Sequence, residues 1–378
     1  MSRRLLIVTS YFPPDQKAGG AEMFTMKMAK GLAEDHGWEV SIATTALNGE
    51  PQNEVVPHYL KVYRLPYRFK LSNSPLSASW IWKLREVIEV AKPDVINVHI
   101  PVPGLGDIAS CVSGDRPIVI NYHFGSMRKG SLVLDPIIWA YETILLPMSL
   151  RKATRIICGT EYVKNGILKK YNNKTSIIHP GVDSSRFYPA KNRTEIPRIL
   201  YVGSLNRSDK HKRFSDLLEA CKILQEDMPN LRLSAVGGGD GREMYENLVA
   251  EMGIAGSVDF HGRLEGDALP EAYRSAAVFV LPSLSETFGM VITEAMATGL
   301  PVVAVNGGGV PTLVDDGKNG ILVPPRDPAA IARALKEILT EPKKASAFGS
   351  AGRLKALERL VWPRQISLMH AVLMDAIT

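Results

Sequence analysis

Two glutamates eight positions apart, Glu286 and Glu294, lie in the segment of the sequence that is most informative about chemistry. Carboxylates are good acceptors for paired sugar hydroxyl groups, and the free N–H groups of a helix's first turn can face a phosphate or hydroxyl oxygen. The expected helix follows Thr287, Phe288 and Gly289. Glu286 should therefore lie at the N-terminal end of this helix, and Glu294 about two turns along it. The spacing indicates a site for a ligand with hydroxyl and phosphate groups, although either glutamate alone is also typical of a solvated helix.

A loop rich in cations comes earlier in the chain. Residues 203–212 follow an apolar run that predicts a strand and precede a helical pattern, which is where ligands of open α/β sheets bind. Four cations cluster there: Arg207, Lys210, Lys212 and Arg213. An arginine can hold a diphosphate with its planar fork, while a lysine supplies a point charge. We interpret the loop as a diphosphate site, with a plain exposed basic loop as the alternative.

Two further candidates lie in the first half of the chain. Gly19 and Gly20 stand between the first apolar run and a helical pattern, where backbone N–H groups can approach an anion, although a simple turn would look the same. His123 follows another expected strand and should lie at the carboxyl edge of its sheet. A histidine there is more often structural than catalytic, but its place at the ligand-binding edge makes it a candidate.

The elements that must position these residues alternate between apolar runs and helical patterns. The runs are continuous rather than alternating, as expected for parallel strands covered on both faces by helices. In the first half the expected strands are 5–9, 40–44, 94–99, 118–122, 155–158 and 176–178. In the second half they are 199–203, 231–236, 257–261, 277–281 and 301–305. The pattern predicts a doubly wound α/β fold in each half.

A polar stretch over residues 183–198 interrupts this rhythm and has the charge and proline content of an interdomain connection. We therefore expect two Rossmann-like domains that face each other across a central cleft. The length of 378 residues agrees with about two domains.

Composition excludes several classes of protein. Hydrophobic residues make up 45% and charged residues 22%, as in ordinary folded proteins. The three cysteines show no C-x-x-C spacing, so we expect no disulfide framework or zinc cluster. The apolar run near the N-terminus is too short for a signal peptide, and we expect a cytoplasmic protein. The sequence also lacks H-E-x-x-H, G-x-S-x-G, a P-loop and a complete dinucleotide-binding fingerprint.

Positive charge is concentrated in the first half. Residues 1–190 carry 23 Lys and Arg against 16 Asp and Glu, whereas residues 191–378 carry 22 against 23. The segment 127–155 adds an apolar, aromatic stretch with basic ends, typical of a helix that lies in a membrane interface. A solvated surface and a core helix are the alternatives that we favour, so peripheral contact with the inner face of the membrane remains open. We expect no nucleic-acid partner.

Together these features resemble the retaining glycosyltransferases of family 4, which have the two-domain GT-B fold. The resemblance spans nearly the whole chain and rests on Gly19-Gly20, on His123, on the Arg207/Lys212 loop and on the Glu286–Glu294 segment. It implies an N-terminal acceptor-binding domain over 1–185 and a C-terminal nucleotide-sugar-binding domain over 186–360. Residues 361–378 should form a final helix that packs back on the first domain.

The same resemblance assigns roles. Arg207 and Lys212 would hold the donor diphosphate, and Glu294 would bind the nucleotide ribose. The donor sugar would be held by Glu286 with the backbone of Phe288 and Gly289, and His123 would contact this sugar near the reacting carbon. Selection of the base would involve the backbone near Arg263 and Leu264.

Three positions depart from the usual pattern of this family. Ser204 stands where an arginine is common, Arg213 where a glycine usually follows the lysine, and Thr312 where a glutamate is common. These departures concern the fine contacts to the donor rather than the class of reaction.

The implied reaction moves a hexose from a nucleoside diphosphate sugar to a hydroxyl acceptor with retention, in glycan, glycolipid or glycoconjugate biosynthesis. UDP-sugars are favoured over GDP-sugars on family frequency. No D-x-D carboxylate pair is present, so we expect no metal and no other cofactor, with fixed cations and helix N-termini stabilising the leaving diphosphate. The alternatives are a nucleotide-sugar epimerase on the same scaffold and a non-catalytic sugar-nucleotide or glycan-binding subunit.

Overall fold

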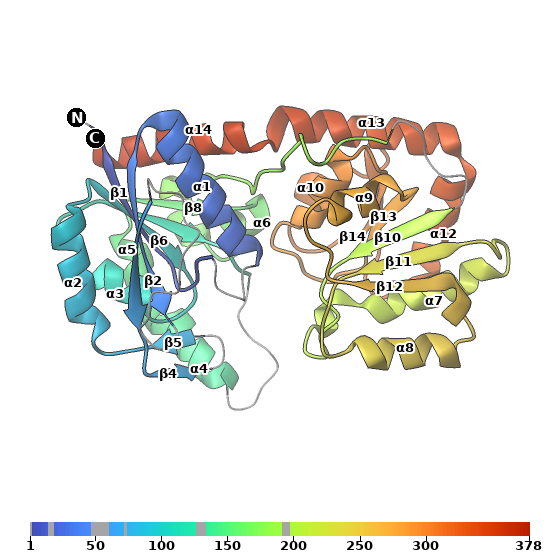
Figure 1. The fold of residues 1–378 in the computed structure, drawn as a ribbon, viewed down its shortest axis with the longest axis horizontal. Coiled ribbons are helices and arrows are strands. Elements are labelled where there is room, and N and C mark those ends of the chain that lie inside the picture. Colours follow the sequence, from blue (N-terminus) through green and yellow to red (C-terminus); the bar gives the residue numbers. More distant parts are fainter. Residues whose placement is uncertain (1, 14–18, 47–59, 72–73, 126–133, 191–196) are drawn as a thin grey trace. The chain divides into compact units, whose positions relative to one another are not determined.

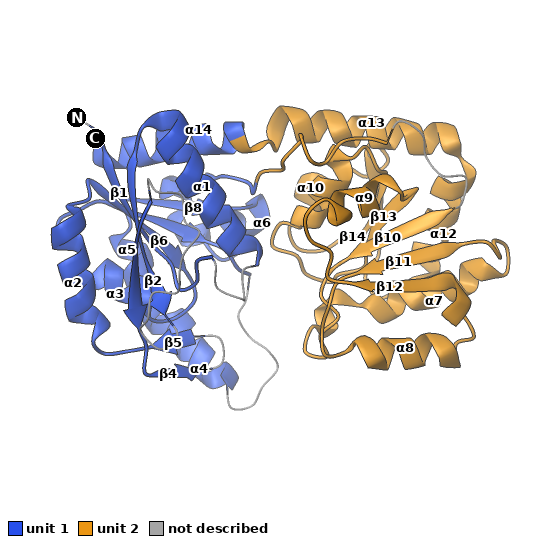
Figure 2. Ribbon diagram, in the orientation of Figure 1, with its two compact units in different colours: residues 1–180, 363–378 blue, residues 181–362 orange. Residues whose placement is uncertain are grey.

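The chain forms two compact units (Figure 2). The structure is a computed structural model, and it describes residues 2–13, 19–46, 60–71, 74–125, 134–190 and 197–378. Unit 1 comprises residues 1–180 and 363–378, and unit 2 comprises residues 181–362. The chain thus passes between the units at 180/181 and 362/363, where the sequence analysis expected 185/186 and 360/361.

Unit 1 is built on a parallel seven-stranded sheet with the order β3-β2-β1-β6-β7-β8-β9. Its strands are β1 (Arg4–Val8), β2 (Glu39–Ala46), β3 (Lys61–Pro66), β6 (Val95–Ile100), β7 (Ile118–Tyr122), β8 (Arg155–Cys158) and β9 (Thr175–Ile177). A separate antiparallel hairpin consists of β4 (Phe69–Leu71) and β5 (Ser74–Leu76). The central strands are buried along their whole length, which explains their continuous apolar sequences.

Helices flank this sheet (Figure 1). They are α1 (Gly20–His36), α2 (Trp80–Ala91), α3 (Leu105–Val112), α4 (Leu134–Ala140), α5 (Leu146–Lys152), α6 (Glu161–Asn165) and α14 (Trp362–Ile377). A π-helix, η1 (Tyr141–Leu145), joins α4 to α5, and a 3-10 helix, η2 (Lys169–Lys174), precedes β9. The expected apolar helix of segment 127–155 is therefore divided, and its residues 127–133 lie outside the described part of the chain.

The last helix, α14, belongs to unit 1 from Pro363 onward. Gln365 accepts a hydrogen bond from the backbone N–H of His179 at 2.9 Å, and Trp38 donates one from its indole to His370 at 2.9 Å. Gly31 of α1 lies so close to Ile366 that a Cβ there would come within 2.2 Å of its side chain. The helix is thus held by both side-chain hydrogen bonds and close packing.

Unit 2 repeats the architecture with a parallel six-stranded sheet of order β12-β11-β10-β13-β14-β15. Its strands are β10 (Arg198–Val202), β11 (Arg232–Val236), β12 (Val258–Gly262), β13 (Val278–Leu281), β14 (Val302–Val305) and β15 (Gly320–Val323). Its α-helices are α7 (Phe214–Gln225), α8 (Arg242–Glu251), α9 (Ala268–Arg274), α10 (Met290–Ala297), α11 (Val310–Leu313), α12 (Pro328–Thr340) and α13 (Pro342–Arg359). Two 3-10 helices complete it: η3 (Lys210–Lys212) and η4 (Ala255–Ser257).

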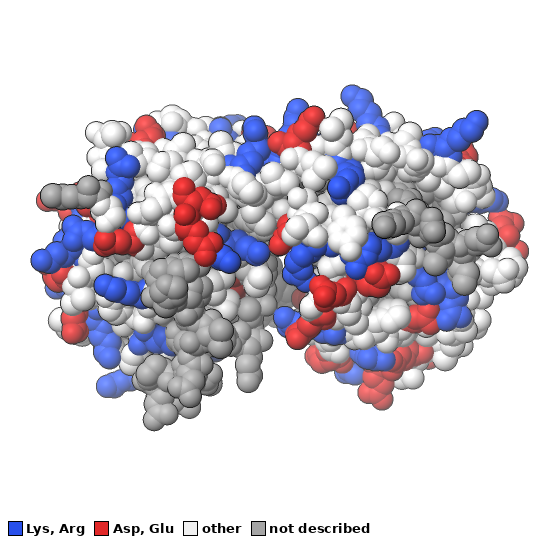
Figure 3. Space-filling view, turned by 45° about the horizontal axis from the view of Figure 1, so that its top comes forward, with Lys and Arg blue, Asp and Glu red and all other residues white. Residues whose placement is uncertain are grey.

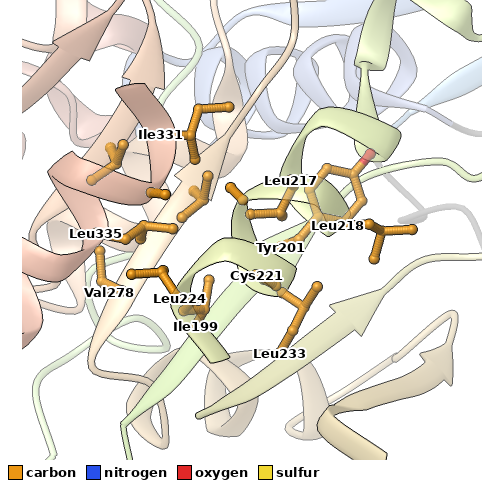
Figure 4. Packing of buried hydrophobic residues seen from close by; sticks show 14 of the residues in the cluster. Ile199, Tyr201, Leu217, Leu218, Cys221, Leu224, Leu233, Val278, Ile331 and Leu335 are labelled. Atoms are coloured by element: carbon orange, nitrogen blue, oxygen red, sulfur yellow. The ribbon is translucent and has the colours of Figure 1, made fainter. Parts of the chain in front are cut away.

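Each unit has its own core. In unit 2, one cluster packs α7 and α12 against one face of the sheet, with Tyr201, Leu217 and Leu335 fully buried (Figure 4). A second cluster, which includes Phe279 and Met296, packs α10 against the other face. Unit 1 is filled by a cluster around Trp80. Both doubly wound domains expected from the sequence are therefore present.

Four strands were not predicted. They are β3, β4, β5 and β15. The strand β3 lies at the sheet edge and is only partly buried, so its sequence carries charges at Lys61 and Arg64 instead of a continuous apolar run. The strands β4, β5 and β15 have three or four residues each, too few for a recognisable pattern.

Candidate functional site

The expected donor site lies at the carboxyl edge of the sheet in unit 2, where the strand order reverses. Chain order runs outward from β10 in one direction and from β13 in the other, and these two strands are neighbours. The loops that follow them are joined, because the backbone N–H of Leu284 donates to the carbonyl of His211 at 2.8 Å. Open α/β sheets bind ligands at such a switch point.

Lys212 and Glu286 meet at this point. The Lys212 ammonium donates to Glu286 Oε1 at 2.5 Å, and their side chains are only 21% and 15% exposed. The two residues are 74 positions apart in sequence, so the neighbouring strands bring them together. Arg207 lies in the same loop but is exposed, and its backbone N–H donates to Asp240 at 2.8 Å. An exposed cation and a largely buried ion pair thus lie at this edge of the sheet.

Arg213 has a structural role at the start of α7. It caps the start of α7 with φ of 49° and ψ of 38°, a left-handed conformation that favours glycine. Its guanidinium holds both carboxylate oxygens of the buried Asp216, at 2.9 and 2.5 Å. The two-point contact explains how an arginine is accommodated where a glycine is usual, and it removes Arg213 from the candidate diphosphate ligands.

Glu294 lies nearer the start of its helix than expected. The helix α10 begins at Met290, so Glu294 is about one turn along it rather than two. Residues 286–289 form the preceding loop because Gly289, with φ of 92°, caps the helix in a conformation open to glycine. Phe288 is buried in the core beside it, and Thr287 is partly buried.

The Glu294 carboxylate is paired with a tyrosine. The hydroxyl of Tyr273 donates to Glu294 Oε2 at 2.7 Å. Burial raises the pKa of Glu294 to about 7, outweighing the Tyr273 hydrogen bond and the positive charge of Arg186, which both lower the pKa. Tyr273 was not predicted as a site residue, since a buried tyrosine in a helical pattern is indistinguishable from a core residue.

The glycine turn after β14 supports Glu286. The backbone N–H of Gly309 donates to the carbonyl of Glu286 at 2.6 Å. Gly308 has φ of 57°, and a Cβ on it would lie 2.3 Å from that carbonyl oxygen. The turn therefore lies directly against the backbone of the Glu286 loop.

A second glycine turn, residues 237–241 after β11, was missed. Gly237 has φ of 143° and packs on Gly203, while Gly239 has φ of 156° and packs on Leu205. The turn braces the backbone that carries Arg207. The run Gly-Gly-Gly-Asp-Gly directly after an expected strand was the available signal.

Arg263 and Leu264 follow β12, the edge strand of the sheet. Arg263 is exposed and pairs with Glu265 at 3.4 Å, and Leu264 packs on the core cluster that contains Phe279. One strand, β11, separates β12 from β10, the strand that precedes the Lys212 loop.

In unit 1, Gly19 caps α1 and Gly20 is its first residue. The Gly19 N–H already donates to the Glu22 carboxylate at 2.7 Å. This acidic side chain occupies one of the donors that the sequence analysis offered to a phosphate. Glu22 also lines a pocket of about 220 Å³ at this edge, together with His99, His123 and Phe124.

His123 belongs to a buried polar network. Its Nε2 lies 2.8 Å from Nδ1 of His99, whose Nε2 lies 3.1 Å from both Asn97 and Asn121. Burial lowers the pKa of His123 to about 4, and burial with the neighbouring His123 lowers that of His99 well below its usual value. Both rings are therefore neutral at pH 7.

The other three members of this network, Asn97, His99 and Asn121, were not predicted, yet the sequence contains a signal. Asn97-x-His99 and Asn121-x-His123 are the same three-residue pattern at the ends of two strands. Because β6 and β7 are adjacent and parallel, the repeat brings four polar side chains together.

Two doubly wound domains, one with a cation–carboxylate pair at its switch point, place this chain among the α/β proteins whose ligands bind at the carboxyl ends of the strands. The sequence profile of "Glycosyltransferase Family 4" matches residues 18–186, and that of "Glycosyl transferases group 1" matches residues 186–355. A D-inositol 3-phosphate glycosyltransferase of Streptomyces scabiei is 30% identical, over 91% of this chain and 84% of its own length. The GDP-mannose-dependent alpha-(1-6)-phosphatidylinositol monomannoside mannosyltransferase of Mycolicibacterium smegmatis is 28% identical, over 95% of each chain.

Solved structures share the fold. A sucrose-phosphate synthase from Thermosynechococcus elongatus superposes with a TM-score of 0.78 at 22% identity, covering 99% of this chain and 98% of its own. Anabaena HepE in complex with UDP gives 0.77 at 18% identity, covering 98% and 100%. The chain belongs to the family 4 glycosyltransferases and has the GT-B fold, as the sequence motifs predicted.

Proposed function

We propose that this glycosyltransferase moves a hexose from a nucleoside diphosphate sugar to a hydroxyl acceptor with retention of the anomeric configuration. The observation that carries the proposal is the Lys212–Glu286 pair at the switch point of unit 2. A diphosphate accumulates negative charge as the sugar–oxygen bond breaks, and a preorganised cation stabilises that charge. With Lys212 engaged by the diphosphate, the Glu286 carboxylate is free to accept sugar hydroxyls.

The remaining contacts follow from the same placement. Arg207, exposed and in the same loop, adds a second cation to the diphosphate. Glu294 accepts the ribose hydroxyls, the amides of residues 287–289 face the donor sugar, and the backbone near Arg263 and Leu264 borders the base. In unit 1, His123 contacts the donor sugar from its pocket. Gly19 and Gly20 contact a phosphate once Glu22 releases the Gly19 N–H.

The donor is a UDP-sugar in this proposal, with a GDP-sugar as the second candidate. The HepE structure holds UDP, and the mycolicibacterial relative is GDP-mannose-dependent. Both relatives named above act on acceptors that carry hydroxyl groups, an inositol phosphate and a phosphatidylinositol mannoside. Titration with a panel of nucleoside diphosphates, monitored by calorimetry, identifies the base. Equal affinity for all of them would reject base selection near Arg263.

The reaction is tested with the donor so identified and a panel of hydroxyl acceptors. NMR of the product anomer should show retention, and an inverted anomer would refute it. Chelation with EDTA should leave the rate unchanged, since Lys212 and Arg207 supply the positive charge that a metal ion would otherwise provide. Loss of activity that a divalent cation restores would reject metal independence.

Lys212→Ala and Glu286→Ala should each lower kcat by about 100-fold or more, because each removes a group that contacts the reacting sugar phosphate. Lys210→Ala, in the same loop with an exposed side chain, is the matched control and should change kcat little. Conversion of the donor without any acceptor would instead favour an epimerase. Nucleotide binding with no turnover of any acceptor would favour a non-catalytic subunit.

We propose further that unit 1 contacts anionic membranes through α4, η1 and α5. Trp139, Ile144 and Met148 are each more than half exposed there, and Arg151 and Lys152 are exposed at the end of α5. Apolar side chains beside cations suit an interface with anionic lipid headgroups. Among the described residues, no helix is long and apolar enough to cross a membrane. On the face drawn in Figure 3, acidic and basic side chains are interspersed.

Sedimentation with phosphatidylglycerol vesicles tests this contact. Binding should be seen at low salt and lost at high salt, since screening shortens the reach of the cations to about 3 Å at 1 M. Ile144→Ser with Met148→Ser should weaken it, whereas Trp82→Ser, equally exposed on α2, should not. Absence of binding at low salt would reject the contact.

A further inference from the structure

His99, which contacts His123 at 2.8 Å, has no part in the donor contacts proposed above. His99 is 6% exposed and sits between two asparagines, a threonine and the second histidine. Both rings are neutral, so each has one ring nitrogen that donates and one that accepts. Whichever of the two facing nitrogens carries the proton, the other must accept it. The tautomer of His99 therefore dictates the tautomer of His123.

The orientation of the asparagines is determined by their backbone and side-chain partners. Asn97 Nδ2 donates to the carbonyl of Val119 at 3.0 Å, so Asn97 Oδ1 faces the network as an acceptor. Asn121 Nδ2 lies 2.9 Å from that oxygen and donates to it. Its second hydrogen is then available to Nε2 of His99, 3.1 Å away.

The hydrogen bonding of Thr25 indicates whether Nδ1 of His99 carries the proton. Its hydroxyl donates to the carbonyl of Ala21 at 2.8 Å, one turn earlier in α1. The hydroxyl oxygen therefore turns a lone pair toward His99 Nδ1, 3.0 Å away. A proton on Nδ1 satisfies both Thr25 and Nε2 of His123, at 2.8 Å.

The two possible proton arrangements are unequal. With the proton on Nδ1 of His99, the only mismatch is the Asn97 oxygen facing an unprotonated Nε2 at 3.1 Å. With the proton on Nε2, two contacts are mismatched: the Thr25 oxygen faces an unprotonated Nδ1, and an Asn121 N–H faces the N–H of Nε2. Buried mismatches of this kind are costly, so the first arrangement is favoured.

We propose that His99 is a positioning residue that donates its Nδ1–H to His123 and so holds His123 as the neutral Nδ1–H tautomer. Nδ1 of His123 has no hydrogen-bond partner within the described residues, and His123 lines the pocket, so this N–H is available to a ligand oxygen. The assignment rests on the proposed function, where His123 contacts the donor sugar. In this state His123 is a hydrogen-bond donor to a hydroxyl oxygen of that sugar and cannot remove a proton from it.

The test separates the tautomer from the activity. In the full chain labelled with ¹⁵N-histidine, long-range ¹H–¹⁵N correlation shows which nitrogen of each of the eight histidines carries the proton. The His123 signals are assigned by their loss in His123→Ala. We expect Nδ1–H for His123 in the wild type and the Nε2–H form or a mixture in His99→Leu, which removes the donor.

His99→Asn serves as the rescue variant, because an asparagine amide can occupy the place of Nδ1–H and donate to His123. It should restore the Nδ1–H form. Thr25→Val leaves the imidazole in place and removes the acceptor that favours the proton on Nδ1, so a mixture of tautomers is expected even if His99→Leu folds poorly. A wild-type Nε2–H signal for His123, or tautomers that do not change in His99→Leu and Thr25→Val, would overturn the proposal.

Kinetics then connect the tautomer to the reaction. His99→Leu should lower kcat by about 10- to 100-fold, because His123 then no longer presents its N–H to the sugar in every molecule. The affinity for the nucleoside diphosphate alone should change less than about twofold. His99→Asn should recover most of the rate. Full activity in His123→Ala, together with the expected tautomers, would reject the role of His123 under the proposed function while leaving the His99–His123 hydrogen bond established.

Discussion

At the scale of single residues, Glu294 faces two opposing requirements. Burial beside Tyr273 raises its pKa to about 7, so the free protein favours the protonated acid. Under the proposed function, Glu294 accepts the ribose hydroxyls, and the ionised carboxylate is the better acceptor for a pair of them. Donor binding therefore has to stabilise a charge that the folded protein disfavours, and stability and function are opposed at this position.

Glu294→Gln should separate the two effects. The folded-state pKa is raised above the usual 4.5, so the stability associated with the protonated form is present below pH 4.5 and lost as pH rises through about 7. At pH 8 the neutral glutamine should stabilise the protein by up to about 3 kcal/mol, and at pH 4.5 by little. Urea unfolding at the two pH values measures this difference, and nucleotide affinity should fall about tenfold or more.

Glu271→Gln, on the exposed side of α9, is the matched control and should change stability by less than about 1 kcal/mol at either pH, because it removes only a surface ion pair. A stability gain in Glu294→Gln that is the same at pH 4.5 and pH 8 would contradict the raised pKa.

At the scale of elements, the turn after β14 positions the loop after β13. Gly308→Ala would place a methyl group against the Glu286 backbone, in a conformation that disfavours alanine. We expect kcat to fall at least about tenfold because Glu286 moves relative to Lys212. Gly317→Ala is the matched control, since Gly317 also has a positive φ, of 72°, but has no atom within 4 Å of an added Cβ. Equal effects of the two variants on kcat would show that the turn does not position Glu286.

The contact between Gly31 of α1 and Ile366 of α14 also positions one element against another. Gly31→Val would force Ile366 away from α1, and overpacking of this kind costs about 1–3 kcal/mol. Thermal unfolding should show a lower Tm, with faster amide hydrogen exchange in α14. Gly256→Val, in open space on η4, should leave exchange in α14 unchanged. Unaltered exchange in Gly31→Val would mean that α14 is held without this contact.

At the scale of the whole molecule, the two units respond to acid in opposite ways. Burial lowers the pKa values of His99 and His123 in unit 1, so the unfolded chain binds more protons than the folded unit between about pH 4 and the usual value of 6.5. Their stability contribution is complete above pH 6.5 and is lost as pH falls. Glu294 in unit 2 has the reverse effect, since it favours the folded state at lower pH.

Scanning calorimetry between pH 7.5 and pH 4.5 should therefore resolve two transitions that move apart. The transition of unit 1 should shift down by several degrees, and that of unit 2 should shift down less or rise. Four of the five tryptophans belong to unit 1, with Trp80 in its core, so tryptophan fluorescence follows mainly the unfolding of unit 1. A single transition, or equal shifts of both, would contradict independent cores.

Much of this architecture could be predicted from the sequence, because covered parallel strands require continuous apolar runs. The strand β7 agrees with the sequence analysis to the residue, and α14 lies within the range 361–378 expected for the final helix. Prediction failed where burial is partial or the element is short, as in β3 and β15. It also placed Glu294 one turn too far along α10, since a glycine with positive φ at position 289 delays the start of the helix.

What the sequence by itself determined is the family, the two domains and the loops that carry the candidate residues. Local spacing suffices for these, since each motif follows its own strand. Only the tertiary structure decided which side chains meet: Lys212 with Glu286, Tyr273 with Glu294, and His99 with His123. These contacts depend on strand order and on side-chain direction, which are set by packing between segments far apart in the chain.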